Sequence, residues 1–423
     1  MLAILTSHPI QYQVPIWRAL HANGRVPFRV WYLTDHGLRG DRDPGFARSF
    51  SWDVDMLGGY RHDFLAVRPD WDLRQFRGVR LAESLADRIC GEGIRVLWVE
   101  GWRFQVFWEA VRIAVRRGVS VWLRGESNDL KQDPVWKSAI KRPMLRRHFR
   151  RIDQFLCIGE ANRRLYRSYG ICDDRLQRAP YCVDNDRFAA ESQALTHQRS
   201  AIRQQWNVPE AAFCILFCGK FITKKRPLDL VNAVQRLNHN GQTLPPVHLL
   251  FVGSGQLGAD LRRQCCIAFD SDPESTMSRV ADDKPQASFV GFLNQTEIAQ
   301  AYVAADLLVL PSDSGETWGL VANEAMACGT PAAVSNLCGC SEDLVAALDP
   351  RLVFRCGDID GLADAISYAR GASLSRQRVQ EIADTHHLRH TVATVESLYP
   401  QAGGFPTIAR GHVALPERPR VVS

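Results

Sequence analysis

Short apolar runs alternate with amphipathic segments over the first 160 residues. Apolar residues recur at helical spacing in segments such as Val14–His21 and Phe104–Arg117. A run of four or five apolar residues is typical of a strand that is buried on both faces. The runs that fit this description are Met1–Leu5, Phe28–Tyr32, Val96–Val99, Val119–Leu123 and Phe155–Ile158. Strands that alternate with helices predict an α/β fold with a doubly wound parallel sheet.

The same alternation starts again after residue 210. Helical spacing returns in Leu228–Leu237 and Glu297–Ala304. The apolar runs between the helical segments are Cys214–Cys218, Val247–Val252, Phe289–Gly291, Leu307–Leu310 and Ala332–Val334. We therefore expect a second doubly wound domain that faces the first across a cleft, because open α/β sheets bind ligands beyond the carboxyl ends of their strands.

A polar stretch from Asp184 to Gln205 separates the two series and contains no convincing strand. We place the domain boundary there, with an amino-terminal domain over 1–200 and a carboxy-terminal domain over 201–375. We expect residues 376–399 to form a helix that packs back on the amino-terminal domain. The tail 400–423, rich in Pro, Gly and Arg, is expected to be poorly ordered.

Length and composition are those of a two-domain globular protein. The 423 residues are 46% hydrophobic and 23% charged, and no apolar stretch approaches the ~18 residues of a membrane-spanning helix. The first residues, Met1–Thr6, lack the basic start of a secretory signal, so we expect a cytoplasmic protein, peripheral to the membrane at most. The 12 cysteines are expected to be reduced, because several lie inside apolar runs.

Charge is distributed unevenly between the two halves. Residues 1–200 contain 33 Lys and Arg against 23 Asp and Glu, whereas the remainder contains 19 against 23. A basic half beside a mildly acidic half indicates that the two halves meet different partners.

The most informative segment runs from Leu307 to Pro331. Its apolar start predicts a strand, Pro311–Gly315 predicts a turn, and Leu320–Cys328 predicts a short helix that ends at a glycine. The free N–H groups at the start of such a helix favour an anion. Glu316 precedes the helix and Glu324 lies inside it, so both carboxylates could reach the hydroxyl groups of one elongated ligand.

The segment Gly-Glu-Thr-Trp-Gly-Leu-Val-Ala-Asn-Glu-Ala-Met-Ala-Cys-Gly-Thr-Pro resembles the signature of retaining glycosyltransferase family 4, the glycosyl transferases group 1. The resemblance implies the GT-B fold, two Rossmann-like domains that face each other across a cleft. It also implies that Glu316 lies beside the donor sugar and that Glu324 binds the ribose. The backbone around the helix start would serve the diphosphate and sugar, at Thr317, Trp318, Gly319 and Leu320. The alternative is an amphipathic helix with two solvated glutamates.

A second stretch, Leu216–Pro227, is similar to a basic element of the same family. By that resemblance Gly219, Lys220 and Lys225 serve the diphosphate, whose charge grows as the sugar–phosphate bond breaks. Lys220 stands where Arg is common, so the charge is kept and bidentate binding is lost. Taken alone, a basic loop is more often solvent-facing.

Two further strand ends resemble the family. Gly253 lies in a glycine-rich turn after a strand, and such a turn by itself commonly just closes the strand. Gly291 and Phe292 end another strand, which the resemblance places at the nucleobase.

The amino-terminal domain resembles the family less. Its first loop lacks the family's glycine pair, which makes His8, Gln11 and Tyr12 candidate side chains of the cleft, although His8 could equally serve a turn. After the strand that ends at Leu123, the family often has a histidine that faces the sugar. Here Arg124 and Glu126 either replace that histidine or form a structural ion pair.

The segment Val135–Ile152 contains seven cations and no acid, with apolar residues interleaved at roughly helical spacing. The cations are Lys137, Lys141, Arg142, Arg146, Arg147, Arg150 and Arg151. It is either an ordinary solvated helix or an element attracted to anionic lipid or to a lipid-linked acceptor. Nucleic acid is disfavoured, because no binding module accompanies the charge.

Together these features predict a retaining transferase that moves a hexose from a nucleoside-diphosphate sugar to a hydroxyl acceptor, in polysaccharide, glycolipid or glycoconjugate synthesis. We expect no metal and no other cofactor, since the lysine pair supplies the positive charge that makes a metal unnecessary. Another GT-B activity is an alternative, either an inverting transferase or a sugar-nucleotide epimerase. So is a nucleotide-sugar-binding protein without turnover. A dinucleotide-dependent oxidoreductase is disfavoured, because no Gly-x-Gly-x-x-Gly follows the first strand.

Overall fold

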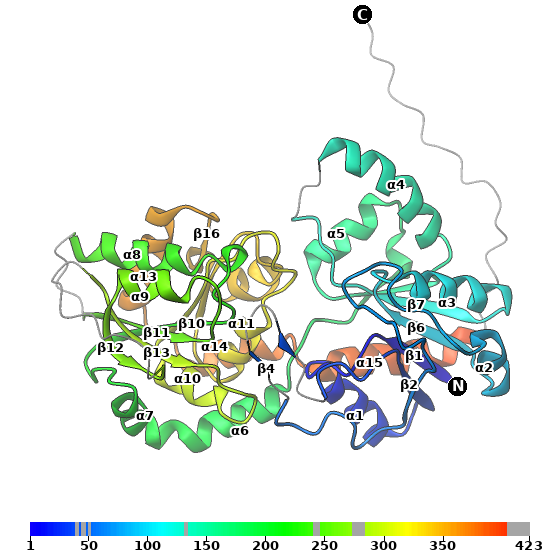
Figure 1. Cartoon of the computed structure of the whole chain (residues 1–423), viewed down its shortest axis with the longest axis horizontal. Coiled ribbons are helices and arrows are strands. Elements are labelled where there is room, and N and C mark those ends of the chain that lie inside the picture. The colour runs from blue at the N-terminus through cyan, green and yellow to red at the C-terminus, as the bar shows by residue number, and fades with distance from the viewer. Residues whose placement is uncertain are drawn as a thin grey trace, which may run out of the picture.

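Two α/β domains lie side by side in the computed structural model (Figure 1). The residues that it describes are 1–38, 42–43, 48–49, 52–130, 134–239, 246–272 and 284–403. Each domain contains a seven-stranded sheet, and every strand pair in these two sheets is parallel. The predicted fold class is therefore confirmed.

The amino-terminal sheet is buried between two layers of helices. Its strands in spatial order are β5 (His62–Phe64), β2 (Phe28–Tyr32), β1 (Leu2–Thr6), β6 (Val96–Glu100), β7 (Ser120–Arg124), β8 (Gln154–Cys157) and β9 (Leu176–Arg178). Successive side chains of β1 point to opposite faces, so Leu2 and Ile4 join one core while Ala3 and Leu5 join another. The helices of this half are α1 (Val14–Asn23), α2 (Leu85–Gly91), α3 (Gln105–Arg116), α4 (Val135–Phe149) and α5 (Glu160–Ser168).

The carboxy-terminal sheet repeats this architecture. Its strands in spatial order are β12 (Cys266–Asp270), β13 (Gln286–Gly291), β11 (Val247–Val252), β10 (Phe213–Cys218), β14 (Leu307–Leu310), β15 (Ala332–Ser335) and β16 (Val353–Phe354). The α-helices between β10 and residue 375 are α8 (Pro227–His239), α9 (Gly258–Gln264), α10 (Ile298–Ala304), α11 (Leu320–Ala327), α12 (Ala346–Leu348) and α13 (Ile359–Gly371). A separate antiparallel pair joins β3 (Arg42–Asp43) to β4 (Arg48–Ser49).

All ten apolar runs that predicted strands form strands in the two sheets. The strands of these two sheets that the pattern missed are β5, β9, β12 and β16, which lie at the outer edges of the sheets, and the pair β3–β4 was missed as well. An edge strand keeps part of its surface in water, so it does not need the continuous apolar run that marks a central strand.

The polar stretch expected at the domain boundary forms two helices, α6 (Asn185–Leu195) and α7 (Arg199–Gln205). Both pack on the carboxy-terminal domain, because Phe188 and Ile202 belong to its hydrophobic core. The chain therefore passes between the domains just before α6, and residues 185–200 belong to the second domain rather than the first.

The chain passes back between the domains near its end. Residues 376–399 form two helices instead of one. The first, α14 (Arg376–Asp384), packs against α11, and the second, α15 (Leu388–Leu398), packs against α1. The expected tail begins with a short 3-10 turn at Pro400–Gly403, and residues 404–423 lie outside the described residues.

All twelve cysteines are free, as expected. Among the helices within the described ranges, none is long and apolar enough to cross a membrane.

Candidate functional site

A glycine allows the tight entry into α11 after β14. Gly319 has a φ of 105°, and an added Cβ there would meet Leu310 at 2.7 Å and the Cys340 Sγ at 3.3 Å. Only glycine combines this left-handed conformation with such close neighbours. The turn leaves the first N–H groups of α11 free of intrahelical acceptors, which is the arrangement that binds anions.

A buried ion pair joins two of the predicted donor residues. The Lys225 Nζ contacts the Glu316 carboxylate, and both side chains are about one-sixth exposed, at 16% and 15%. Ser312 also donates to Glu316, over 3.3 Å. Although burial lowers the pKa of Lys225, the Glu316 carboxylate raises it above its usual value. The lysine is therefore held in its charged form beside the start of α11.

Three of the predicted glycines stack at adjoining strand ends. Gly219 directly follows β10, Gly253 directly follows β11, and Gly291 is the last residue of β13. All three have positive φ angles. The Gly253 N–H donates to the Gly291 carbonyl over 2.7 Å, and an added Cβ on Gly253 would lie 2.0 Å from the Gly219 oxygen. Because the three glycines carry no side chains, this packing leaves a surface of backbone atoms beside Phe292. Lys220, which is half-buried, directly follows Gly219.

Glu324 lies deeper than the sequence indicated, with only 2% of its surface exposed. The Tyr302 hydroxyl donates to its carboxylate. Tyr12, from the amino-terminal domain, also reaches this carboxylate, and burial together with the charge of Glu324 raises the pKa of Tyr12 well above its usual value. Burial likewise raises the pKa of Glu324. This position contradicts the alternative of a solvated glutamate on a surface helix.

The side chains beside Glu316 hold the two domains together. The Trp318 ring is 3% exposed, stacks on Tyr181 of the amino-terminal domain at 6.1 Å, and donates to Asn323 over 2.8 Å. Asn128 of the amino-terminal domain donates to the Thr317 carbonyl over 2.9 Å. Trp318 can therefore offer a ligand mainly its backbone, whereas the side chain of Thr317 is exposed. Leu320 lies half-buried at the start of α11.

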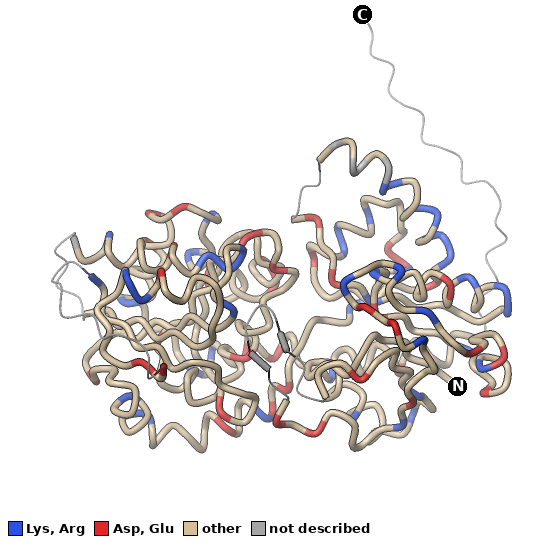
Figure 2. Tube along the Cα trace, in the orientation of Figure 1, with Lys and Arg blue, Asp and Glu red and all other residues tan. Residues whose placement is uncertain are grey.

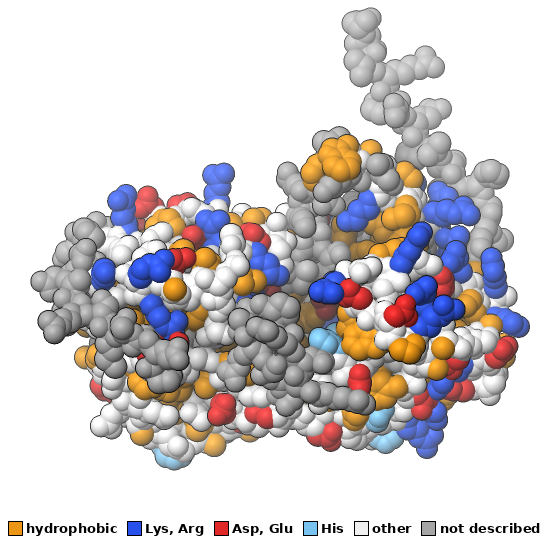
Figure 3. All heavy atoms as spheres, in the orientation of Figure 1, with side chains coloured by type: hydrophobic (Ala, Val, Ile, Leu, Met, Phe, Trp, Pro, Cys, Tyr) orange, Lys and Arg blue, Asp and Glu red, His pale blue; other side chains and the backbone are white. Residues whose placement is uncertain are grey.

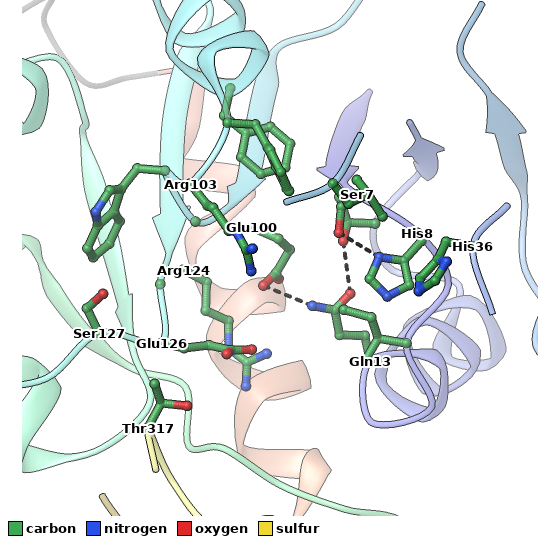
Figure 4. Close-up of a pocket in the computed structure, with 18 of the residues that line it drawn as sticks. Ser7, His8, Gln13, His36, Glu100, Arg103, Arg124, Glu126, Ser127 and Thr317 are labelled. Carbon is green, nitrogen blue, oxygen red and sulfur yellow. Dashed lines mark hydrogen bonds between the residues drawn. The ribbon is translucent and has the colours of Figure 1, made fainter. Parts of the chain in front are cut away.

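A pocket of about 870 Å³ opens at the carboxyl ends of the amino-terminal strands. The polar and aromatic residues that line it are Thr6, Ser7, His8, Gln13, His36, Trp71, Asp72, Arg74, Glu100, Trp102, Arg103, Phe104, Phe107, Arg124, Glu126, Ser127 and Thr317. Thr317 brings the donor-side loop to its edge, as Figure 4 shows. The pocket therefore adjoins the loop that carries Glu316.

Of the residues predicted on the amino-terminal side, three line this pocket and two do not. His8 lies in it, with its Nδ1 2.8 Å from the Ser7 hydroxyl and its ring packed edge-on against His36. Gln11 and Tyr12 lie outside the pocket lining, and Tyr12 turns to Glu324 instead.

Arg124 and Glu126 line the pocket without forming an ion pair with each other among the interactions of the described residues. The Arg124 guanidinium donates to the Pro180 carbonyl over 3.2 Å and lies 5.2 Å from the Tyr181 ring centre. Glu126 accepts a hydrogen bond from the Tyr181 hydroxyl. Tyr181 thus contacts both residues. The alternative in which Arg124 and Glu126 form a structural ion pair with each other is wrong.

The sequence reasoning missed Glu100, which ends β6 in the middle of the pocket. Gln13 donates to its Oε2 over 3.3 Å (Figure 4). Burial raises the pKa of Glu100 to about 7, the charge of Arg124 lowers it, and that of Glu126 raises it. The sequence did contain a signal for Glu100, which is its position directly after an apolar run. Polar residues at the carboxyl ends of adjacent parallel strands gather at one edge of the sheet.

Residues 198–385 match the family described as glycosyl transferases group 1. D-inositol 3-phosphate glycosyltransferases from Mycobacteroides abscessus and Mycolicibacterium smegmatis are 32% and 31% identical over 209 and 226 residues, or 48% and 52% of this chain. These alignments span less than half of the relatives' own length, 41% and 46%.

Solved structures match over nearly the whole chain. An α,α-trehalose 6-phosphate synthase from Burkholderia multivorans has a TM-score of 0.68 at 13% identity, covering 98% of this chain and 99% of its own. Anabaena HepE in complex with UDP and glucose has a TM-score of 0.61 at 14% identity, covering 95% and 99%. The chain thus has the GT-B fold, and most of its carboxy-terminal domain matches the glycosyl transferases group 1.

Proposed function

We propose that this protein is a glycosyltransferase that moves a hexose, with retention of configuration, from a nucleoside-diphosphate sugar to a hydroxyl acceptor. The observation that carries the proposal is the buried Lys225–Glu316 pair beside the free N–H groups of α11, with Glu324 farther along the same helix. One cation, one helix start and two carboxylates match the diphosphate, the sugar and the ribose of such a donor.

The diphosphate is the leaving group, and its negative charge increases as the sugar–phosphate bond breaks. Lys225 and Lys220, together with the start of α11, can stabilise that charge in a site already positioned before the reaction. A donor phosphate would draw Lys225 from Glu316 and leave this carboxylate to the sugar hydroxyls. Because two lysines supply the positive charge, we propose that no metal takes part, and excess chelator is expected to leave turnover unchanged.

The nucleotide of the donor is proposed to be a uridine diphosphate. The support comes from the structural neighbour crystallised with UDP and glucose, and from a second crystal of the same protein with UDP-glucose. The acceptor is proposed to belong to polysaccharide, glycolipid or glycoconjugate synthesis, because the pocket beside the donor loop is larger than one monosaccharide needs.

The basic segment supports contact with an anionic membrane surface. Lysine and arginine positions follow one another along α4 (Figure 2), and hydrophobic and basic side chains are both exposed over this helix (Figure 3). Trp136 is 64% exposed and Met144 is 51% exposed on α4, while Leu145 and Phe149 anchor the helix in the core. Exposed apolar residues among cations are typical of elements that lie on anionic lipid.

Thermal unfolding with UDP-, GDP- and ADP-sugars tests the donor proposal. A ligand that binds only the folded state raises its stability, so at least one donor is expected to raise Tm. NMR of the transferred sugar then reports its anomeric configuration. An inverted product would favour an inverting transferase, with His8 of the pocket as its candidate base. If none of these donors stabilises the protein and none is turned over, the proposed function is refuted.

A further inference from the structure

Two buried polar atoms at the floor of the amino-terminal pocket have no hydrogen-bond partner among the described residues. They are the Oε1 of Glu100 and the Nε of Arg124. The first accepts a hydrogen bond and the second donates one. Buried polar groups are almost always paired, so two unpaired groups of opposite polarity in one pocket point to a ligand.

The fold holds these two groups beside each other. Glu100 and Arg124 are partners in the register of β6 and β7, and adjacent strands lie about 4.8 Å apart. Gln13 fixes the other oxygen of Glu100, and the Pro180 carbonyl fixes the Arg124 guanidinium (Figure 4 shows the pocket). Neither side chain is therefore free to turn away and find another partner.

An aromatic side chain stands next to this floor. An added Cβ on Gly125 would lie 2.1 Å from the Trp102 ring, so the ring packs directly over the residue that follows Arg124. Trp71 lines the same pocket. Sugar and cyclitol rings present C–H groups that pack against aromatic faces, while their hydroxyls need hydrogen-bond partners at the ring edge.

We propose that Glu100 and Arg124 bind two neighbouring hydroxyls of a sugar or cyclitol acceptor. One hydroxyl donates to the Glu100 Oε1, and the adjacent hydroxyl accepts from the Arg124 Nε. This inference rests on the proposed function and narrows its acceptor to a molecule with a vicinal diol. Both residues come from the amino-terminal domain, so they bind the acceptor without touching the nucleotide.

The test uses small polyols as probes of the UDP-saturated protein. Myo-inositol, cis-cyclohexane-1,2-diol and cis-cyclohexane-1,3-diol are titrated with saturation-transfer NMR as the readout, which requires no turnover. The two cyclohexanediols differ only in the spacing of their hydroxyls. We expect the native protein to bind the 1,2-diol more tightly, by roughly tenfold, because only that spacing can satisfy both groups.

Two variants locate the effect. Glu100→Gln and Arg124→Lys are each expected to weaken myo-inositol binding about tenfold and to abolish the preference for the 1,2-diol. UDP affinity should stay unchanged in both. Glu109→Gln is the matched control and should keep the preference. Glu109 lies on α3 of the same domain, where it accepts a hydrogen bond from Gln105 and faces Arg112 at 3.9 Å, and it does not line the pocket. Thermal unfolding reports whether each variant is folded.

Equal binding of the two diols by the native protein, or no binding of any probe, would overturn the proposal. So would a Glu100→Gln variant that is folded and still prefers the 1,2-diol. If no nucleotide sugar binds or turns over, yet diol binding still depends on Glu100, the proposed transferase fails while the diol site stands.

Discussion

The two halves of the cleft differ in how their charged groups are satisfied. In the carboxy-terminal half, Lys225 forms an ion pair with Glu316, and Tyr302 donates to one oxygen of Glu324, whose Oε1 is buried without a partner among the described residues. In the amino-terminal half, Glu100 and Arg124 each keep one buried atom without a partner among the described residues. A donor phosphate must therefore displace Glu316 from Lys225, whereas an acceptor can bind Glu100 and Arg124 without breaking an ion pair between them. The difference suggests strong electrostatic binding on one side and shape-dependent hydrogen bonding on the other.

The largest effect on turnover is expected from removing the cation Lys225 of the carboxy-terminal half. Lys225→Ala should lower kcat about 10²- to 10³-fold, since the lysine acts mainly on charge that develops in the transition state. Donor KM should change much less. Steady-state kinetics with the donor found by thermal screening measures both constants.

Lys224→Ala is the matched control, because Lys224 lies in the same turn but is exposed and only reaches the Gly315 carbonyl, over 3.5 Å. It should keep turnover within a few-fold. A Lys225 variant in which KM alone changes would show that the lysine holds only the ground state.

The next effect concerns the ribose. Glu324→Ala should weaken UDP binding by about 1.5–3 kcal/mol, because the ribose hydroxyls lose a charged acceptor. Calorimetric titration with UDP and with its 2′,3′-dideoxy analogue separates this contact from general damage. The analogue should bind the native protein and the variant alike. If the variant loses the same affinity for both nucleotides, Glu324 does not bind the ribose.

A smaller effect tests the basic surface of the amino-terminal half. Arg146→Ser with Arg147→Ser should reduce co-sedimentation with phosphatidylserine vesicles by about 1 kcal/mol for each cation removed, and added salt should reduce the native protein's binding. Arg116→Ser with Arg117→Ser, two exposed cations at the end of α3, is the control. If the two double variants sediment equally with the vesicles, α4 is a solvated helix that does not bind lipid.

The smallest effect concerns pH and Glu100. Because burial raises its pKa from 4.5 to about 7, native Glu100 keeps a proton that the unfolded chain loses above pH 4.5. This contribution to stability is present at low pH and is lost as pH rises through 7. The charges that face it are Arg124 and Glu126, and His8 and His36 line the same pocket.

Glu100→Gln cannot ionise, so its stability relative to the native protein should rise by about 1–2 kcal/mol between pH 5 and pH 8, after allowance for solvent at the pocket mouth. Urea unfolding at the two pH values measures the difference. Parallel pH profiles for the two proteins would show that Glu100 titrates normally.

The donor half was largely predictable because its chemistry lies in continuous stretches of sequence. Gly219, Lys220 and Lys225 follow one strand, and Glu316 and Glu324 follow another. A parallel sheet brings such strand ends to one edge, and the resemblance of both stretches to the glycosyltransferase family implied their roles at one donor. The sequence did not predict the burial of Glu324, because it could not show that Tyr302 and Tyr12 lie against this carboxylate.

The acceptor half was harder to predict because its pocket is assembled from many separate segments. Glu100 directly follows the apolar run Val96–Val99, and its role depends on the register that sets it beside Arg124. The separate helix α14 was missed for a similar reason, since residues 376–399 carry helical spacing throughout and only packing decides where the helix breaks. Edge strands and domain crossings are fixed by tertiary contacts, which one sequence does not contain.

The chain leaves the amino-terminal domain before α6 and returns to it before α15, and these two passages are bonded to each other. Arg178 donates to the Thr385 carbonyl over 2.7 Å, and Asn185 donates to the Ala383 carbonyl over 3.0 Å. The carboxy-terminal domain is thus inserted into the chain so that its two ends meet at one place on the amino-terminal domain. A graft of residues 185–384 from a related protein needs to match only this junction and the facing surface. Under the proposed function, such a graft exchanges the donor site as a unit and leaves the pocket of the amino-terminal domain unchanged.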